Sequence, residues 1–116
     1  MKNFLAIYTG TSDKIDAYKK LDERERAKRD EAGMKAWMEW GTKHAASIIN
    51  QGGPLGKTKR TASDGVSDTR NGMAAYVVVK AESHEEAAKM FLNHPHFTIF
   101  PGDAVEIMEC LPFPGQ

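Results

Sequence analysis

Histidines are the side chains of this sequence best suited to move protons, because the pKa of imidazole lies close to neutral pH. His44 follows Trp40 by about one helical turn, beside an apolar stripe. A buried imidazole there, next to a carboxylate, can act as a general base. The alternative is a half-exposed helix histidine that makes one hydrogen bond. Both remain open, since the sequence does not locate a partner carboxylate.

A second pair of histidines stands in His94-Pro95-His96, where a predicted helix ends. His96 can serve as a base, and Asp103 can orient it from the end of the same loop. Two histidines at this spacing can also approach a metal, with Asp103 or Glu106 as a third ligand. The spacing is common, however, and His94 can instead interact with the last helix carbonyls. We therefore predict no tightly bound metal.

Two kinds of residue can hold a substrate. Lys57, with Lys59 and Arg60, forms a basic strip that can bind a carboxylate or phosphate, although solvated strand lysines look the same in sequence. Trp40 can stack on a ligand, although Trp37 and Trp40 can equally be core or dimer contacts. We predict that any pocket is bounded by the long helix and the strands that follow it.

Other chemistry has little support in the sequence. No Gly-rich phosphate loop, nucleophile elbow, zinc motif or nucleotide fingerprint is present, so we expect no cofactor. Cys110 is the one cysteine, which excludes an internal disulfide. Its apolar neighbours in a predicted strand favour a buried, inert thiol.

The helices and strands that position these residues can be predicted from the spacing of apolar residues and from residues typical of turns. The apolar run 4–8 predicts a buried strand, and Ser12 an N-cap for a short helix. A longer helix should begin after Asp22 and end near Asn50, with Gln51 to Pro54 as a turn. Its apolar stripe contains Met34, Trp37, Met38, Gly41, Ala45 and Ile48.

The second half of the chain alternates strands with one helix. Strands are predicted over 55–61, 66–70, 73–80 and 104–111, with tight turns at Asp64-Gly65 and Asn71-Gly72. Ser83 and Glu86 form a capping box for a helix from His84 to about residue 93, which Pro95 should end.

With the 66–70 strand set aside, the order is βαββαβ, the α+β arrangement of a ferredoxin-like fold with an antiparallel sheet. Right-handed crossovers place the first and third core strands side by side in the centre. Both helices then cover one face, and the other face must be hidden. A second copy of the sheet is the simplest cover. We predict a homodimer of a single domain spanning residues 1–116.

Charge and hydropathy exclude several functional classes. Sixteen basic and sixteen acidic residues cancel, so no strong field favours nucleic acid or an anionic membrane. No apolar stretch approaches the roughly 18 residues of a membrane span, and residues 1–10 lack the pattern of a signal peptide. A cytoplasmic protein without nucleic-acid or membrane partners is expected.

Several motifs resemble those of the YCII-related family, also called DGPF after a motif that begins Asp-Gly. The resembling stretches are Gly53-Pro54-Leu55-Gly56, Asp64-Gly65, Asp68-Thr69-Arg70, and the strand and alanine-rich helix that follow. The chain departs from the family at Val66-Ser67, where Pro-Phe and one further residue are expected. The resemblance implies a dimeric α+β barrel, in which two ferredoxin-like sheets pack together.

The same resemblance bears on activity. Some members resemble lyases that act on small organic molecules with a His–Asp pair, the histidine lying early on the first long helix. The corresponding stretch here, near Ala36 and Trp37, has no histidine, so the pair is not carried over. We expect a cofactor-independent lyase or isomerase that acts on a small organic molecule by His-assisted proton transfer, with His44, His96 and Asp103 as candidates. The alternative is a non-catalytic binding or accessory module.

Overall fold

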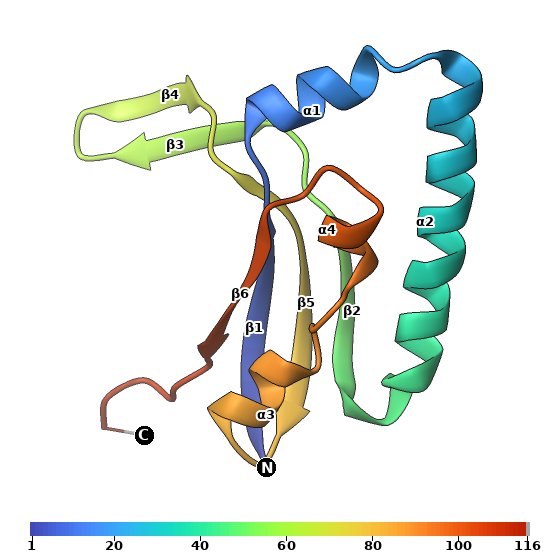
Figure 1. The fold of residues 1–116 in the computed structure, drawn as a ribbon. Helices are drawn as coiled ribbons and strands as arrows, with labels where there is room; N and C mark the ends of the chain where they lie inside the picture. Colours follow the sequence, from blue (N-terminus) through green and yellow to red (C-terminus); the bar gives the residue numbers. More distant parts are fainter. Residues whose placement is uncertain (116) are drawn as a thin grey trace.

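The structure is a computed structural model that describes residues 1–115. Figure 1 shows its elements in chain order: β1 (Lys2–Thr9), α1 (Ser12–Lys19), α2 (Glu23–Lys43), a 3-10 turn (Ala45–Ser47), β2 (Ile48–Pro54), β3 (Thr58–Ala62), β4 (Gly65–Thr69), β5 (Met73–Ala81), α3 (His84–Lys89), α4 (Pro95–Thr98) and β6 (Ala104–Glu109). Strands β2, β5, β1 and β6 form an antiparallel sheet in that order. The predicted ferredoxin-like topology is confirmed, with β1 and β5 in the centre.

The core lies between this sheet and the helices on one of its faces. Alternate residues of β1 point to that face, so Phe4, Ala6 and Tyr8 are buried together with Val77 and Val79 of β5. The residues between them point to the opposite face, which no helix of the described chain covers. That open face carries Leu5, Ile7, Tyr76, Val78 and Met108.

The boundary between α2 and β2 differs from the prediction. The helix ends at Lys43, well before Asn50, and residues 51–54 belong to β2 instead of forming a turn. The glycines serve a β-bulge: Gly52 has a φ of +59°, its N–H donates to Asn50 Oδ1 at 2.9 Å, and a Cβ there would lie 2.0 Å from the Tyr76 carbonyl oxygen. The residues typical of a turn are therefore present, but they form a bulge inside a strand.

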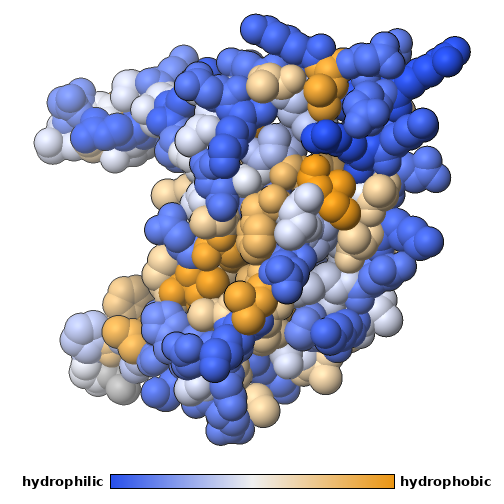
Figure 2. Space-filling model, in the orientation of Figure 1, coloured by the Kyte–Doolittle hydropathy of each residue, from blue (hydrophilic) through white to orange (hydrophobic). Residues whose placement is uncertain are grey.

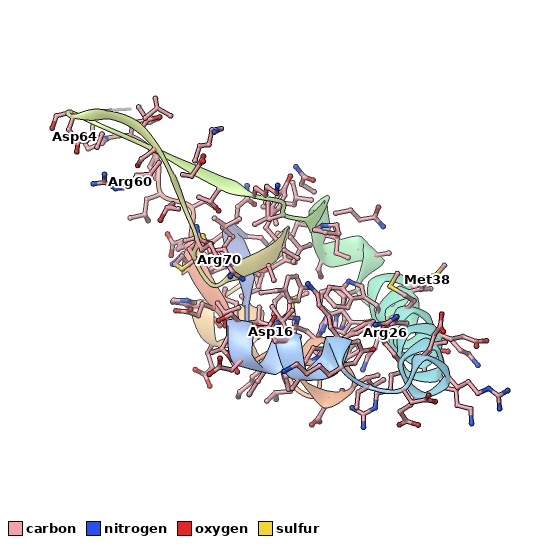
Figure 3. The ribbon with its side chains drawn as sticks, turned by 90° about the horizontal axis from the view of Figure 1, so that it is seen from above. Asp16, Arg26, Met38, Arg60, Asp64 and Arg70 are labelled. Atoms are coloured by element: carbon pink, nitrogen blue, oxygen red, sulfur yellow. The ribbon has the colours of Figure 1, made fainter. Side chains whose placement is uncertain are left out.

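The prediction of a core strand over residues 55–61 is also wrong. Strands β3 and β4 pair only with each other, in a hairpin whose turn lies at the predicted Asp64-Gly65. Figure 3 shows this hairpin projecting from the molecule, with Asp64 at its far end. An ion pair between Lys59 and Asp68 (2.7 Å) links its strands. Both side chains are exposed, so the pair stabilises the hairpin little.

The inward side of α2 is rotated from the predicted stripe. Gly33, Trp37 and Trp40 face the core, whereas the side chains of Met34 and Met38 are 54% and 69% exposed. Gly33 is buried because the Phe100 ring lies directly on it. A glycine in the middle of a helix is costly on its own, so the close approach of Phe100 explains its place.

Adding one methyl group at Gly33 should therefore destabilise the protein. A Cβ there would lie 2.4 Å from Phe100 Cζ, so Gly33→Ala must displace the ring and should cost about 1–3 kcal/mol. Gly41→Ala is the matched control on the same helix, with no atom within 4 Å of the new Cβ. It should stabilise by about 0.5–1 kcal/mol through helix propensity. Urea unfolding measures the free energy of unfolding of both variants. Equal changes in the two would contradict the packing of Phe100 on Gly33.

The last third of the chain follows the predicted order with three corrections. Ser83 caps α3 as predicted, accepting from the Glu86 N–H at 3.1 Å, but α3 ends at Lys89. Pro95 does not end that helix; it begins α4 at a position where its missing N–H costs nothing. Cys110 follows β6 and is exposed instead of buried. Within residues 1–115, no helix combines the length and apolar character that crossing a membrane requires.

Candidate functional site

A cavity of about 710 Å³ lies between α2 and the inner face of the sheet. Its walls are mainly apolar and come from α2, β2, β5 and the segment around α4. Its lining includes Tyr8, Trp37, Trp40, His96 and Phe100. Figure 2 shows hydrophobic residues gathered in the middle of the molecule, between the hydrophilic hairpin and the hydrophilic outer side of α2. The size and the lining suit a small organic molecule.

His96 is the polar side chain of the cavity best placed to accept a proton. It lies on α4 and is 7% exposed. Its Nε2 lies 2.7 Å from the Thr9 carbonyl oxygen, which can only accept, so Nε2 carries the hydrogen. Nδ1 of the neutral ring therefore holds a lone pair. No buried side-chain N or O in residues 1–115 lacks a hydrogen-bond partner, and Nδ1 has none there, so this atom is accessible.

The surroundings of His96 keep it neutral at physiological pH. Burial lowers its pKa below the ordinary 6.5, opposed by the Thr9 carbonyl and by the negative charge of Asp103. Gly102 makes the position possible, since a Cβ there would lie 2.2 Å from His96 Nε2. The Asp103 N–H donates to the same Thr9 oxygen at 2.9 Å, which fixes the carbonyl that orients the ring.

His94 lies behind the cavity wall and connects His96 to Tyr8. Its Nδ1 accepts from the His96 backbone N–H at 3.0 Å, so the neutral ring carries its proton on Nε2. That nitrogen lies 3.3 Å from Tyr8 Oη. The rings of Trp37 and Trp40 surround His94, with centroids at 4.6 and 4.8 Å. Burial, with small contributions from His96 and His44, lowers its pKa to about 4.

His94 is buried in its neutral form, so the stability of the protein should decrease at acidic pH. Below pH 6.5 the unfolded chain binds a proton that the folded protein does not bind until about pH 4. The free energy of unfolding should thus fall by roughly 3 kcal/mol from this group as pH decreases across that window. His94→Gln should remove that part of the pH dependence. Urea unfolding at pH 7 and pH 4 measures this difference. If the free energy of unfolding fell equally in wild type and in His94→Gln, the lowered pKa could not be assigned to His94.

The structure brings together some of the predicted site residues and not others. His96 and Trp40 line the cavity, and Trp40 offers only its ring face because its indole N–H donates to the Met90 carbonyl at 2.8 Å. His44 caps α2 and packs on Trp40 with centroids 4.8 Å apart, outside the cavity lining. Its pKa is lowered by burial and by Lys43.

Asp103 and Lys57 also stay outside the lining. The carboxylate of Asp103 pairs with Lys14, and the partner of His96 Nε2 is the Thr9 carbonyl instead of a carboxylate. Lys57 is exposed in the link between β2 and β3. Asp103 acts on His96 through its charge and through its N–H, which donates to the Thr9 carbonyl. Lys59 and Arg60 of the predicted basic strip lie on the projecting hairpin.

Sequence reasoning did not identify Tyr8 as a site residue. The side chain of Tyr8 is 1% exposed and lines the cavity at the end of β1. The alternation of Phe4, Ala6 and Tyr8 toward one face was the available signal, since it places a phenol among apolar side chains. Trp37 contacts Tyr8, with centroids 4.9 Å apart, and forms part of the same wall.

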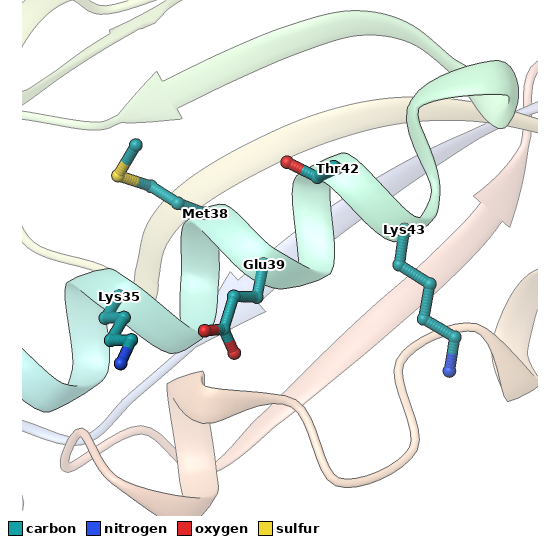
Figure 4. Close-up of a pocket in the computed structure, with 5 residues that line it drawn as sticks. All are labelled: Lys35, Met38, Glu39, Thr42 and Lys43. Carbon is teal, nitrogen blue, oxygen red and sulfur yellow. The ribbon is translucent and has the colours of Figure 1, made fainter.

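A second, shallow depression lies on the outer side of α2 (Figure 4). Its lining residues, Lys35, Met38, Glu39, Thr42 and Lys43, all come from this one helix. Glu39 lies one turn from each lysine, as on many solvated helix faces. Within residues 1–115, no three His, Cys, Asp or Glu side chains gather in a way that could hold a metal.

Comparisons with known proteins support the fold and leave the activity open. No family model and no curated protein matches the chain. Among solved structures it is similar to 5-chloro-2-hydroxyhydroquinone dehydrochlorinase from Burkholderia phenoliruptrix, in complex with 2,5-dihydroxybenzoquinone. The TM-score is 0.56 at 16% identity, covering 94% of this chain and 93% of that one. At this identity the similarity establishes a shared α+β fold, and membership of the YCII-related family stays a prediction.

Proposed function

We propose that the protein is a cofactor-independent lyase or isomerase that removes a proton from a small, flat organic molecule. The observation that carries the proposal is the state of His96. Its Nε2–H is held by the Thr9 carbonyl, its Nδ1 has a free lone pair, and the ring lines an aromatic cavity of about 710 Å³. A neutral imidazole fixed in this way is a general base for an acidic C–H.

The cavity supplies the other requirements of such a reaction. Trp37, Trp40 and Phe100 offer ring faces and edges to a flat ligand and exclude water from around the base. The similar solved structure, named as a dehydrochlorinase with a bound dihydroxybenzoquinone, gives the chemical class to test first. We therefore infer that the substrate is a small cyclic molecule with carbonyl or phenol oxygens.

Two probes test this function with the wild-type protein. The first is 5-chloro-2-hydroxyhydroquinone, whose loss of HCl is followed as chloride release. The second is cyclohexane-1,4-dione in D₂O, whose uptake of deuterium reports enolisation without any leaving group. We expect acceleration of at least one reaction, by the factor of 10² to 10⁴ typical of a positioned base. Rates no faster than buffer with both probes would contradict catalysis.

A binding module is the second candidate, favoured by the apolar walls and by the absence of Asp103 from the lining. This function predicts saturable binding of 2,5-dihydroxybenzoquinone in a calorimetric titration, with neither probe converted. A catalytic protein should both bind and convert. The two experiments together therefore separate the candidates.

We further propose that the protein forms a homodimer through the open face of its sheet. Leu5, Ile7, Tyr76, Val78 and Met108 form an apolar surface there that water would otherwise contact. A two-layer α+β fold must cover this surface, and an identical sheet matches it in size and character. The helices and the cavity lie on the other face, so both copies keep an accessible site.

A further inference from the structure

We propose that the hydroxyl of Tyr8, held in place by His94, donates a hydrogen bond to the substrate's carbonyl oxygen and stabilises the oxyanion that forms when His96 takes the proton. This inference rests on the proposed function and deepens it. It names the substrate class as enolisable carbonyl compounds, including the keto forms of phenols. It also assigns a catalytic role to Tyr8 and a positioning role to His94.

Two hydrogen bonds of His94 behind the cavity fix the position of its ring proton. The backbone N–H of His96 donates to His94 Nδ1 at 3.0 Å, so this nitrogen cannot carry a hydrogen. The proton of the neutral ring therefore sits on Nε2, which donates to Tyr8 Oη at 3.3 Å. Because Tyr8 Oη accepts from His94, its own hydrogen must point elsewhere.

We place that hydrogen on the side of the cavity. Tyr8 lines it, and within residues 1–115 its hydroxyl has no hydrogen-bond partner other than His94. Burial raises the pKa of the Tyr8 phenol well above its ordinary value, so the group remains a donor at neutral pH. A donor held in a fixed direction among apolar walls is the arrangement that stabilises a developing oxyanion.

Tyr8 and His96 are close enough to act on one small molecule, since their ring centroids lie 5.1 Å apart. In the reaction, Nδ1 of His96 takes the proton from the carbon beside the carbonyl. The C–H electron pair forms a C=C bond, and the carbonyl π pair moves to oxygen, which Tyr8 stabilises. In a lyase the carbonyl then re-forms as an anion leaves the neighbouring carbon. In an isomerase His96⁺ returns the proton to another carbon.

The chain from His96 to His94 to Tyr8 also couples the two catalytic groups mechanically. A single short segment, α4 and the residue before it, supplies both histidines. The tautomer of His94 is fixed by the main chain, and the aromatic rings around it exclude water that might re-orient it. The donor and the base are thus held in one rigid unit before substrate arrives.

Binding of 2,5-dihydroxybenzoquinone tests the proposal without needing turnover, because this planar, acidic compound carries enolate oxygens at neutral pH. Tyr8→Phe should weaken binding about 10- to 100-fold, the effect expected for one hydrogen bond to a charged oxygen. Tyr18→Phe is the matched control: it also loses one phenol hydroxyl, which donates to Asp30 outside the cavity, and should bind within 3-fold of wild type.

Variants at His94 test whether this residue positions the Tyr8 hydroxyl or only supports the fold. His94→Phe should weaken binding as much as Tyr8→Phe, and the double variant should be no weaker than either single one. His94→Gln should restore affinity, because its amide can accept from the His96 N–H and donate to Tyr8. Equal affinity of Tyr8→Phe and wild type, or additive losses in the double variant, would overturn the inference. If Tyr8→Phe weakens binding but the wild-type protein converts neither probe, the proposed function is contradicted, while the hydrogen bond from Tyr8 to a ligand oxygen is supported.

Discussion

His96→Asn should lower the rate of deuterium exchange or chloride release by a factor of 10² to 10⁴, the contribution of a positioned general base. The asparagine amide ends short of the position of Nε2, so the variant loses the bond to the Thr9 carbonyl together with the basic lone pair, and it is compared only if it remains folded. The rate with wild-type protein should also fall as pH drops through the pKa of His96, which burial places below 6.5, because a protonated ring cannot accept.

His44→Asn is the control that separates the two histidine candidates of the sequence. His44 packs on Trp40 but does not line the cavity, so this variant should keep its rate within 3-fold of wild type. Thermal unfolding shows that each variant is folded before rates are compared. If His44→Asn abolished the reaction and His96→Asn did not, the assigned base would be wrong.

Val78→Lys should convert the proposed dimer to a monomer. Val78 lies on a central strand of the open face, opposite Leu5 of β1, so a second sheet packed there would bury the new ammonium group without a partner. Sedimentation at micromolar concentration should show wild type at twice the 12.9 kDa of one chain and the variant at 12.9 kDa. In the monomer the lysine can extend into water, so the fold should survive.

Val66→Lys provides the corresponding surface control. Val66 is 68% exposed on the projecting hairpin and is not part of the sheet face. This variant should sediment as wild type does. A wild-type mass of 12.9 kDa, or a Val78→Lys mass twice that, would contradict an interface formed by this face.

The topology was predictable from the sequence because its strongest signals are local. The apolar run of β5, the N-cap at Ser83 and the Asp64-Gly65 turn each depend on a few adjacent residues, and all three are present. Strand β2 was missed because its glycines form a bulge, which has the composition of a turn. The inward face of α2 was misplaced because Gly33 carries no apolar side chain, although the Phe100 ring lies directly on it.

The site was only partly predictable, since its key contacts join distant parts of the chain. The loop around His96 was recognisable by its two histidines and by Asp103 at its end. Its partner, the Thr9 carbonyl, is a main-chain atom 87 positions away that composition cannot reveal. Asp103 follows the same loop, yet its carboxylate pairs with Lys14. The tautomers of His94 and His96, on which the chemistry depends, exist only in the folded protein.

A crystal structure with 2,5-dihydroxybenzoquinone bound is the most direct test of the central claim, that the cavity between α2 and the sheet is a proton-transfer site. The account predicts the ring of this compound against Trp37, with one oxygen within hydrogen-bond distance of Tyr8 Oη and Nδ1 of His96 facing a ring atom. A ligand bound elsewhere, or bound in the cavity with both Tyr8 and His96 turned away from it, would contradict the account.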